Sequence, residues 1–229
     1  MRNTDTYVII PVYNEAKVVA GVIKKVSKYY KNIICVNDGS NDDSKVLIIK
    51  SGATHIEHPI NLGAGAATQT GVDYALQFPE AKYFVTIDAD GQHDINDAVR
   101  MLKYLKAHDL DIVFGSRFIG KVNNIGTFKR IFLKLAAYSS NKTSGGVNLT
   151  DPHIGLRVFN RKFAENLKLT LPDFSHASEV VYRIAEGKYK YAEVPVTVTY
   201  SSYSKAKGQP MLNAINITID LFFNRITRK

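Results

Sequence analysis

Two carboxylates one residue apart, Asp88 and Asp90, come directly after the apolar run Tyr83–Ile87. The run has the β-branched and aromatic composition of a buried strand, so both acids are expected at its carboxyl end. Open α/β sheets bind their ligands at that end of the strands. Two hard oxygens in such a turn suit a Mg²⁺ or Mn²⁺ ion that also binds a phosphate. Acidic turns are also common without any metal, so the rest of the chain has to decide between the two interpretations.

Three further polar motifs each follow an apolar run of strand character. They are Pro11-x-Tyr13-Asn14-Glu15, Asp38-Gly39-Ser40 and the glycine-bearing segment 61–71, which contains Gly63. Each one alone is typical of ordinary turn chemistry. Because parallel strands end at the same edge of a sheet, four such motifs in succession favour a nucleotide-binding cleft at that edge.

The elements that must position these motifs alternate between strand and helix. Strands are predicted to begin at Tyr7, Asn32, Ala53, Tyr83 and Asp111, and helices to cover about 16–30, 41–50, 61–78 and 95–107. Asn14 is expected as the N-cap of the first helix. This alternation predicts an α/β fold with a doubly wound, mostly parallel sheet flanked by helices. Without an internal repeat or a linker, residues 1–210 are expected to form one domain.

Composition and charge narrow the class of protein. The chain has 229 residues, 45% of them hydrophobic, and a formal charge of +9, which implies an anionic partner. No basic run exceeds two residues, so a nucleic-acid-binding tail is not expected. Cys35 is the only cysteine and lies in an apolar run, so we expect a core residue. Neither a signal peptide nor a transmembrane stretch of 18 apolar residues is found, which favours a cytoplasmic protein, soluble or peripheral to a membrane.

The order of the motifs resembles family 2 glycosyltransferases of the GT-A fold. The residues that carry the resemblance are Pro-x-Tyr-Asn-Glu, Asn-Asp-Gly-Ser-x-Asp, Asn-x-Gly-x-Gly and Asp-Ala-Asp-Gly-Gln, in that order. Within the family, residues 6–200 are most similar to dolichol- or polyprenyl-phosphate hexose synthases. The resemblance implies a nucleotide-sugar donor, UDP- or GDP-hexose, and a divalent metal. Two departures are Asn37, where an aspartate is usual, and Ala64, where a lysine or leucine is common.

The resemblance also assigns expected roles to the residues of the donor side. Those expected to bind the nucleotide are Pro11, Tyr13, Glu15, Asp38, Gly63 and Asp88. Those expected to bind the metal are Asp88, Asp90 and Gln92. The departure at Asn37 bears on the choice of nucleobase.

A second group of residues is expected to bind an acceptor phosphate. Ser116 and Arg117 follow the fifth strand, and Arg130 lies in a predicted helix at about 128–141. The resemblance implies that both arginines hold a lipid phosphate, for which the planar guanidinium is well suited. Lys205 and Lys207 lie in a small, polar and basic loop at 201–209, which suggests a flap that grips phosphate.

Two acids remain as candidates near the reacting groups. Asp151 lies in the segment Asp151-Pro-x-x-Gly155-x-Arg157, which resembles a family segment near the donor sugar; it could equally cap a turn. Glu179 stands alone where transferases that deprotonate a sugar hydroxyl usually carry an acidic pair. The expected catalytic residues are Asp90, Asp151 and Arg117.

Whether the enzyme needs a general base depends on the chemistry of the acceptor. A sugar hydroxyl needs a general base, whereas a phosphomonoester, with its second pKa near ~6, is already ionised at pH 7. We therefore expect an inverting transfer of a hexose to a polyprenyl phosphate, either dolichyl or undecaprenyl. The alternatives are a transferase that extends a glycan, with Asp151 or Glu179 as base, and a non-catalytic sugar-nucleotide-binding or membrane-adaptor subunit.

The last segment, Met211–Lys229, has apolar residues at helical spacing and ends in basic residues. The pattern predicts an amphipathic helix. Two interpretations remain open: an anchor at the cytoplasmic face of a membrane, or a helix packed on its own domain or on a second subunit of a homo-oligomer.

Overall fold

The computed structural model describes residues 2–119, 134–135, 137–138, 141–142, 146–171 and 175–199. Predictions for Arg130, for the loop 201–209 with Lys205 and Lys207, and for the helix 211–229 lie outside these residues. Within the described part of the chain, no helix is both long enough and apolar enough to cross a bilayer.

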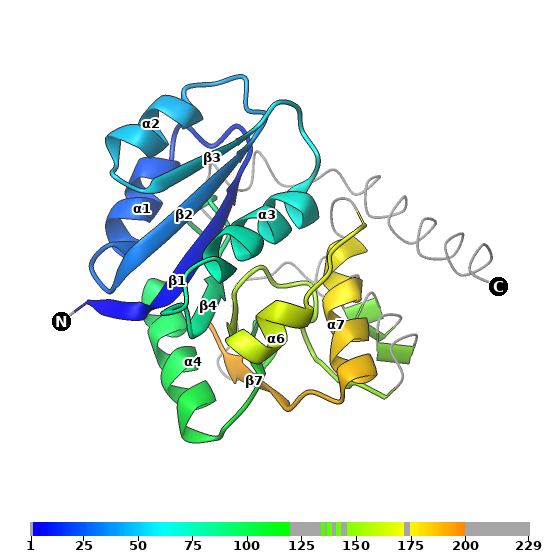
Figure 1. Ribbon diagram of the computed structural model, residues 1–229. Helices are drawn as coiled ribbons and strands as arrows, with labels where there is room; N and C mark the ends of the chain where they lie inside the picture. The colour runs from blue at the N-terminus through cyan, green and yellow to red at the C-terminus, as the bar shows by residue number, and fades with distance from the viewer. Residues whose placement is uncertain are drawn as a thin grey trace.

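A single seven-stranded sheet organises the fold (Figure 1). Its strands, in chain order, are β1 (Asn3–Val12), β2 (Tyr30–Asp38), β3 (Thr54–His58), β4 (Tyr83–Thr86), β5 (Ile112–Ser116), β6 (Arg157–Asn160) and β7 (Tyr191–Pro195). Their spatial order is β3-β2-β1-β4-β6-β5-β7. All neighbours pair in parallel except β6, which runs antiparallel to both β4 and β5. The predicted mostly parallel sheet is confirmed.

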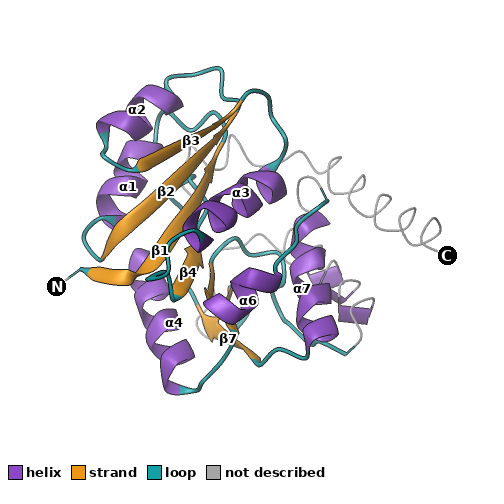
Figure 2. Ribbon diagram, in the orientation of Figure 1, coloured by secondary structure: helices purple, strands orange, loops and turns teal. Residues whose placement is uncertain are grey.

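Helices cover both faces of this sheet (Figure 2). They are α1 (Val19–Val26), α2 (Ser44–Lys50), α3 (Ala64–Leu76), α4 (Ile95–Ala107), α6 (Arg161–Asn166) and α7 (Ser175–Gly187). Because successive side chains of a strand point to opposite faces, β1 supplies two cores. Val8 and Ile10 pack with α1 and α4, whereas Tyr7 and Ile9 pack with α3, α6 and α7.

Two details differ from the sequence-based expectations. The first helix begins at Val19 rather than near residue 16, and it has no side-chain cap. Asn14, the predicted cap, has a left-handed backbone (φ 53°), and its side chain accepts a hydrogen bond from the Asn41 backbone instead. Strand β6 was not predicted, because four residues starting with an arginine carry little periodic signal.

Candidate active site at the carboxyl edge of the sheet

The loops that follow β1 and β2 are tied together by hydrogen bonds from backbone to side chain. The amides of Asn14 and Glu15 donate to the hydroxyls of Ser40 and Ser44, each at 2.9 Å. Glu15 is buried, Pro11 is partly buried and Tyr13 is 42% exposed. The structure therefore brings three of the predicted nucleotide-binding residues to one edge of the sheet and presents the tyrosine ring to solvent.

Asp38 is buried and uses both carboxylate oxygens inside the protein. It accepts the backbone amides of Leu62 (2.9 Å) and Gly63 (2.8 Å), and His58 Nδ1 lies 2.7 Å away. The other ring nitrogen of His58 lies 2.9 Å from the Thr70 hydroxyl on α3. Asp38 thus holds the glycine loop in place, with Gly63 in a conformation (φ 93°) that favours glycine. His58 was not identified from the sequence, although it lies at the end of a predicted strand.

Asn37, the departure from the usual aspartate, pairs with a residue of the neighbouring strand. It is fully buried, and its amide nitrogen donates to both carboxylate oxygens of Glu57, at 3.1 and 3.2 Å. Burial alone would raise the pKa of Glu57, but the hydrogen bonds from Asn37 and His55 lower it below its usual value. Asn37 therefore pairs with a carboxylate of the neighbouring strand, where an aspartate would repel it.

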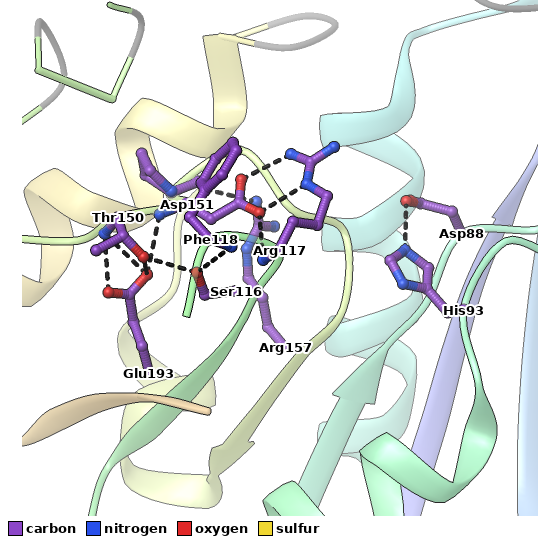
Figure 3. Close-up of polar contacts among 10 residues, drawn as sticks. Asp88, His93, Ser116, Arg117, Phe118, Thr150, Asp151, Arg157 and Glu193 are labelled. Carbon is purple, nitrogen blue, oxygen red and sulfur yellow. Dashed lines mark hydrogen bonds and ion pairs between the residues drawn. The ribbon is translucent and has the colours of Figure 1, made fainter. Parts of the chain in front are cut away.

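Asp88 and Asp90 lie at the carboxyl end of β4, as predicted. The Asp88 side chain is 46% exposed, and its Oδ2 lies 3.1 Å from His93 Nε2 (Figure 3). Asp90 accepts hydrogen bonds from the backbone and side-chain nitrogens of Gln92. Partial desolvation would raise the pKa of Asp88, but the hydrogen bond from His93 and nearby positive charges lower it overall. Burial, and then the charge of Asp88, raise the pKa of Asp90 to about 6.

This set of donors fits a divalent cation. Two hard carboxylates repel each other in a cleft, and a Mg²⁺ or Mn²⁺ ion between them would remove that repulsion. The side-chain oxygen of Gln92 could add a third ligand. Nowhere in the described ranges do three or more His, Cys, Asp or Glu side chains group as metal ligands. A metal held by Asp88 and Asp90 would have coordination positions left for the oxygens of a diphosphate.

Arg117 and Asp151, predicted separately, form one buried ion pair. Arg117 donates from Nε and Nη2 to the two oxygens of Asp151, both at 2.6 Å, and from its backbone amide at 3.0 Å. Asp151 is 2% exposed. This bidentate geometry is the strong form of a charge-assisted hydrogen bond.

Ser116 and Glu193 hydrogen-bond to Thr150 and Asp151 and so hold the loop that carries this ion pair (Figure 3). The Ser116 hydroxyl is buried and lies 2.6 Å from the Thr150 hydroxyl. Glu193, on β7, accepts the backbone amides of Thr150 and Asp151. Burial raises the pKa of Glu193 above its ordinary value. Glu193 was not predicted as a site residue, because its partners are more than 40 positions away in the sequence.

Glu179, the other candidate base, is occupied as well. Its two oxygens accept the Thr170 hydroxyl (2.7 Å) and the backbone amides of Thr170 and Leu171 (2.8 Å each). It therefore ties the segment before α7 to that helix, and this segment packs against Gly65 at the start of α3.

Gly155 and Arg157, quoted above only as parts of a motif, lie next to Asp88. A Cβ atom added to Gly155 would overlap the carboxylate of Asp88, and the Gly155 carbonyl accepts the Thr86 hydroxyl at 2.8 Å. Arg157 is 3% exposed, and the charges of Asp88 and Asp151 both act on it. Next to the motif of Asp88 and Asp90, the Thr199 amide donates to the Gln92 carbonyl at 2.9 Å.

Comparisons with known proteins agree with this geometry. Residues 7–168 match the model of glycosyl transferase family 2. The chain is 30% identical to the UDP-N-acetylglucosamine–dolichyl-phosphate N-acetylglucosaminyltransferase of Methanococcus voltae, over 92% of each chain. It is 28% identical to the polyprenol monophosphomannose synthase of Mycolicibacterium smegmatis, over 85% of this chain and 77% of that one.

A solved structure shares the fold. It is the glucosyl-3-phosphoglycerate synthase of Mycobacterium tuberculosis in complex with Mn²⁺ and UDP-glucose, with a TM-score of 0.70 and 16% identity over 97% of this chain and 78% of that one.

Proposed function

The chain belongs to glycosyltransferase family 2, and from this premise we propose that it transfers a hexose from a nucleotide sugar to a polyprenyl phosphate. The names of two relatives support the acceptor, since one is a dolichyl-phosphate transferase and the other a polyprenol monophosphomannose synthase.

The proposal is supported by one observation: both candidate bases, Asp151 and Glu179, accept hydrogen bonds from other groups of the protein. Asp151 accepts hydrogen bonds from Nε and Nη2 of the Arg117 guanidinium, and Glu179 accepts three hydrogen bonds from Thr170 and Leu171. A carboxylate engaged in this way is a poor general base, because accepting a proton would cost it those bonds. A phosphate acceptor needs no base, since it is already ionised at neutral pH.

The proposed roles of the residues follow from their positions. The loops that carry Tyr13, Glu15 and Gly63 bind the nucleotide, and Asp38 fixes the glycine loop. Asp88, Asp90 and Gln92 would hold a divalent metal, which supplies positive charge to the departing diphosphate. Arg117, together with Arg130, Lys205 and Lys207, orients the acceptor phosphate and offsets its repulsion from the donor.

The reaction is balanced without a proton transfer. An oxygen of the acceptor phosphate forms a bond to the anomeric carbon as the bond from that carbon to the nucleoside diphosphate breaks. Attack in line with the leaving group inverts the configuration at the anomeric carbon.

Incubating the protein with UDP- and GDP-hexoses, Mn²⁺ and one of two acceptors tests the proposal. We expect a glycolipid product with polyprenyl phosphate and none with the parent polyprenol. Asp88→Asn is the matched negative control. Transfer to free sugars or glycans, with the polyprenyl phosphate left unused, would favour the glycan-extending alternative. Nucleotide-sugar binding without any turnover would favour a non-catalytic subunit.

The membrane is the proposed location of the acceptor, with residues 1–210 as the catalytic domain and residues 211–229 as an amphipathic anchor at the cytoplasmic face. Removal of residues 211–229 should abolish co-sedimentation with anionic liposomes. It should spare transfer to a short, water-soluble prenyl phosphate. If the full chain fails to co-sediment but loses a dimer or its fold on truncation, the segment is a structural element rather than an anchor.

A further inference from the structure

Arg157 is a buried cation whose own hydrogen bonds are incomplete. It opens β6, between β4 and β5, and is 3% exposed. Its Nη2 donates to the Pro152 carbonyl at 3.3 Å, and its guanidinium lies 5.7 Å from the centre of the Phe114 ring. Its Nε has no hydrogen-bond partner among the described residues. A buried charge with so few bonds is costly unless opposite charges balance it.

The balance comes from two carboxylates, Asp88 and Asp151. Burial lowers the pKa of Arg157 to about 10, while Asp88 and Asp151 favour its charged form, so it remains a cation at neutral pH. Asp88 belongs to the metal motif, and Asp151 is the partner of Arg117. The ion pair Arg117–Asp151 and the hydrogen-bonded pair His93–Asp88 (Figure 3) each contribute one carboxylate that favours the charged form of Arg157.

We infer that Arg157 is a positioning residue that couples the metal motif to the acceptor arginine. Arg157 offsets part of the negative charge of Asp151. Asp151 therefore neutralises the charge of Arg117 less completely, and Arg117 can attract an anionic acceptor. Because Arg157 holds the Pro152 carbonyl and lies two residues after Gly155, it fixes the segment against which the Asp88 carboxylate lies. The acceptor part of this inference rests on the proposed function, whereas the link to Asp88 does not.

The backbone strengthens the coupling. Gly155, two residues before Arg157, lies against the Asp88 carboxylate, and its carbonyl accepts the Thr86 hydroxyl. A shift of the segment 151–157 would therefore move Asp88 and Arg157 together. This is the behaviour expected of the shell that orients a metal ligand.

Three variants test the inference: Arg157→Met, Arg157→Lys and, as the matched control, Arg161→Met. Arg161 makes partly buried hydrogen bonds to the backbone carbonyls of Leu76, Phe78 and Ala81, at the opposite end of β6. Calorimetry would give the affinity for Mn²⁺ with UDP or GDP, and kinetics the KM for a short prenyl phosphate. We expect Arg157→Met to weaken nucleotide binding tenfold or more and to raise the acceptor KM. Arg157→Lys should recover most of the nucleotide affinity, and Arg161→Met should change only the Tm.

Equal nucleotide affinities in Arg157→Met and Arg161→Met would overturn the inference. Should Arg157→Met not fold, the double variant Arg157→Met with Asp88→Asn removes the opposing charge as well. We expect it to regain a cooperative melting transition, and no regain would exclude an electrostatic link to Asp88. If the natural protein uses no prenyl phosphate, the proposed function fails, while the calorimetric comparison still decides the link to Asp88.

Discussion

Single contacts define what each residue of this site can do. Asp88 is half exposed and hydrogen-bonded to His93, whereas burial and the charge of Asp88 raise the pKa of Asp90. Asp38 and Asn37 are adjacent in sequence but serve different partners, because alternate residues of β2 point to opposite faces. Substitutions that change one contact at a time therefore give the sharpest tests.

Gly155→Ala should separate metal binding from folding. The added methyl group would overlap the Asp88 carboxylate and force it away from its present position. We expect the affinity for Mn²⁺ with nucleotide to fall tenfold or more. Gly21→Ala is the control, because a Cβ at that helical position meets nothing within 4 Å. That control should gain roughly 0.5–1 kcal/mol of stability. Calorimetry and thermal melting of both variants check the prediction.

Asp90→Asn should stabilise the metal-free protein near neutral pH. The folded-state pKa of Asp90, about 6, lies above its ordinary value, so the folded protein keeps a proton that the unfolded chain releases. Stability is therefore lost as pH rises from about 4 to 6. The variant removes that loss, and we expect a gain of about 1–2 kcal/mol above pH 6 that vanishes below pH 4. Denaturant melts of both proteins at several pH values check this. A difference in the free energy of unfolding that stays constant with pH would contradict the prediction.

Asn37→Asp should destabilise the protein by about 1–3 kcal/mol, because a carboxylate at this fully buried position would face the partly exposed carboxylate of Glu57. The second substitution Glu57→Gln should restore most of that loss, since an amide can then pair with the new aspartate. Denaturant unfolding of both single variants and of the double variant measures the coupling. Additive effects would show that the two side chains do not interact.

At the scale of elements, loops at the carboxyl edge are held by side chains of neighbouring strands. Asp38 on β2 holds the loop that leads from β3 into α3, and His58 on β3 joins Asp38 to Thr70 of α3. Glu193 on β7 holds residues 150 and 151 in the same way. The rigid sheet thereby fixes loops that have little secondary structure of their own.

Asp38→Ala should loosen the glycine loop without unfolding the sheet. The amides of Leu62 and Gly63 would lose a charged acceptor, and such a bond is worth about 1.5–3 kcal/mol. Hydrogen exchange of these two amides should therefore accelerate by roughly ten- to a hundredfold, since ~1.4 kcal/mol is tenfold. Asp73→Ala is the control, because Asp73 accepts an exposed hydrogen bond from the Gln69 side chain, one turn away on the surface of α3. Unchanged exchange in Asp38→Ala would contradict the proposed clamp.

At the scale of the whole molecule, ligand binding at one edge should stabilise the entire sheet. The candidate site draws on loops after β1, β2, β3, β4 and β5, so a bound nucleotide with its metal would join all of them. Saturation at a hundred times the Kd adds about 2.7 kcal/mol to the free energy of unfolding.

Thermal melting should record that gain as a Tm increase of about 5–10 °C with Mn²⁺ and UDP or GDP. Chelation of the metal, or the substitution Asp88→Asn, should remove most of the increase. An equal increase in the presence of a chelator would show that the nucleotide binds without a metal.

The sequence by itself determined the parallel half of the sheet and the edge at which its polar motifs lie. Buried parallel strands are continuous apolar runs, and turns carry glycine and short polar residues, so both signals are local. Asp88, Asp90, Asp38 and Tyr13 were placed at one edge for this reason.

Only the tertiary structure decided how the other half of the site is assembled. The antiparallel strand β6 lies between β4 and β5 and brings the preceding residues 151–156 to the ends of both, so that Asp151 meets Arg117 across 34 residues and Gly155 meets Thr86 across 69. Such pairings depend on strand order and on the burial of opposite charges, neither of which leaves a periodic pattern in the sequence. The role of Arg157 follows from that arrangement, because the electrostatic effect of a buried cation depends on the carboxylates that the fold places around it.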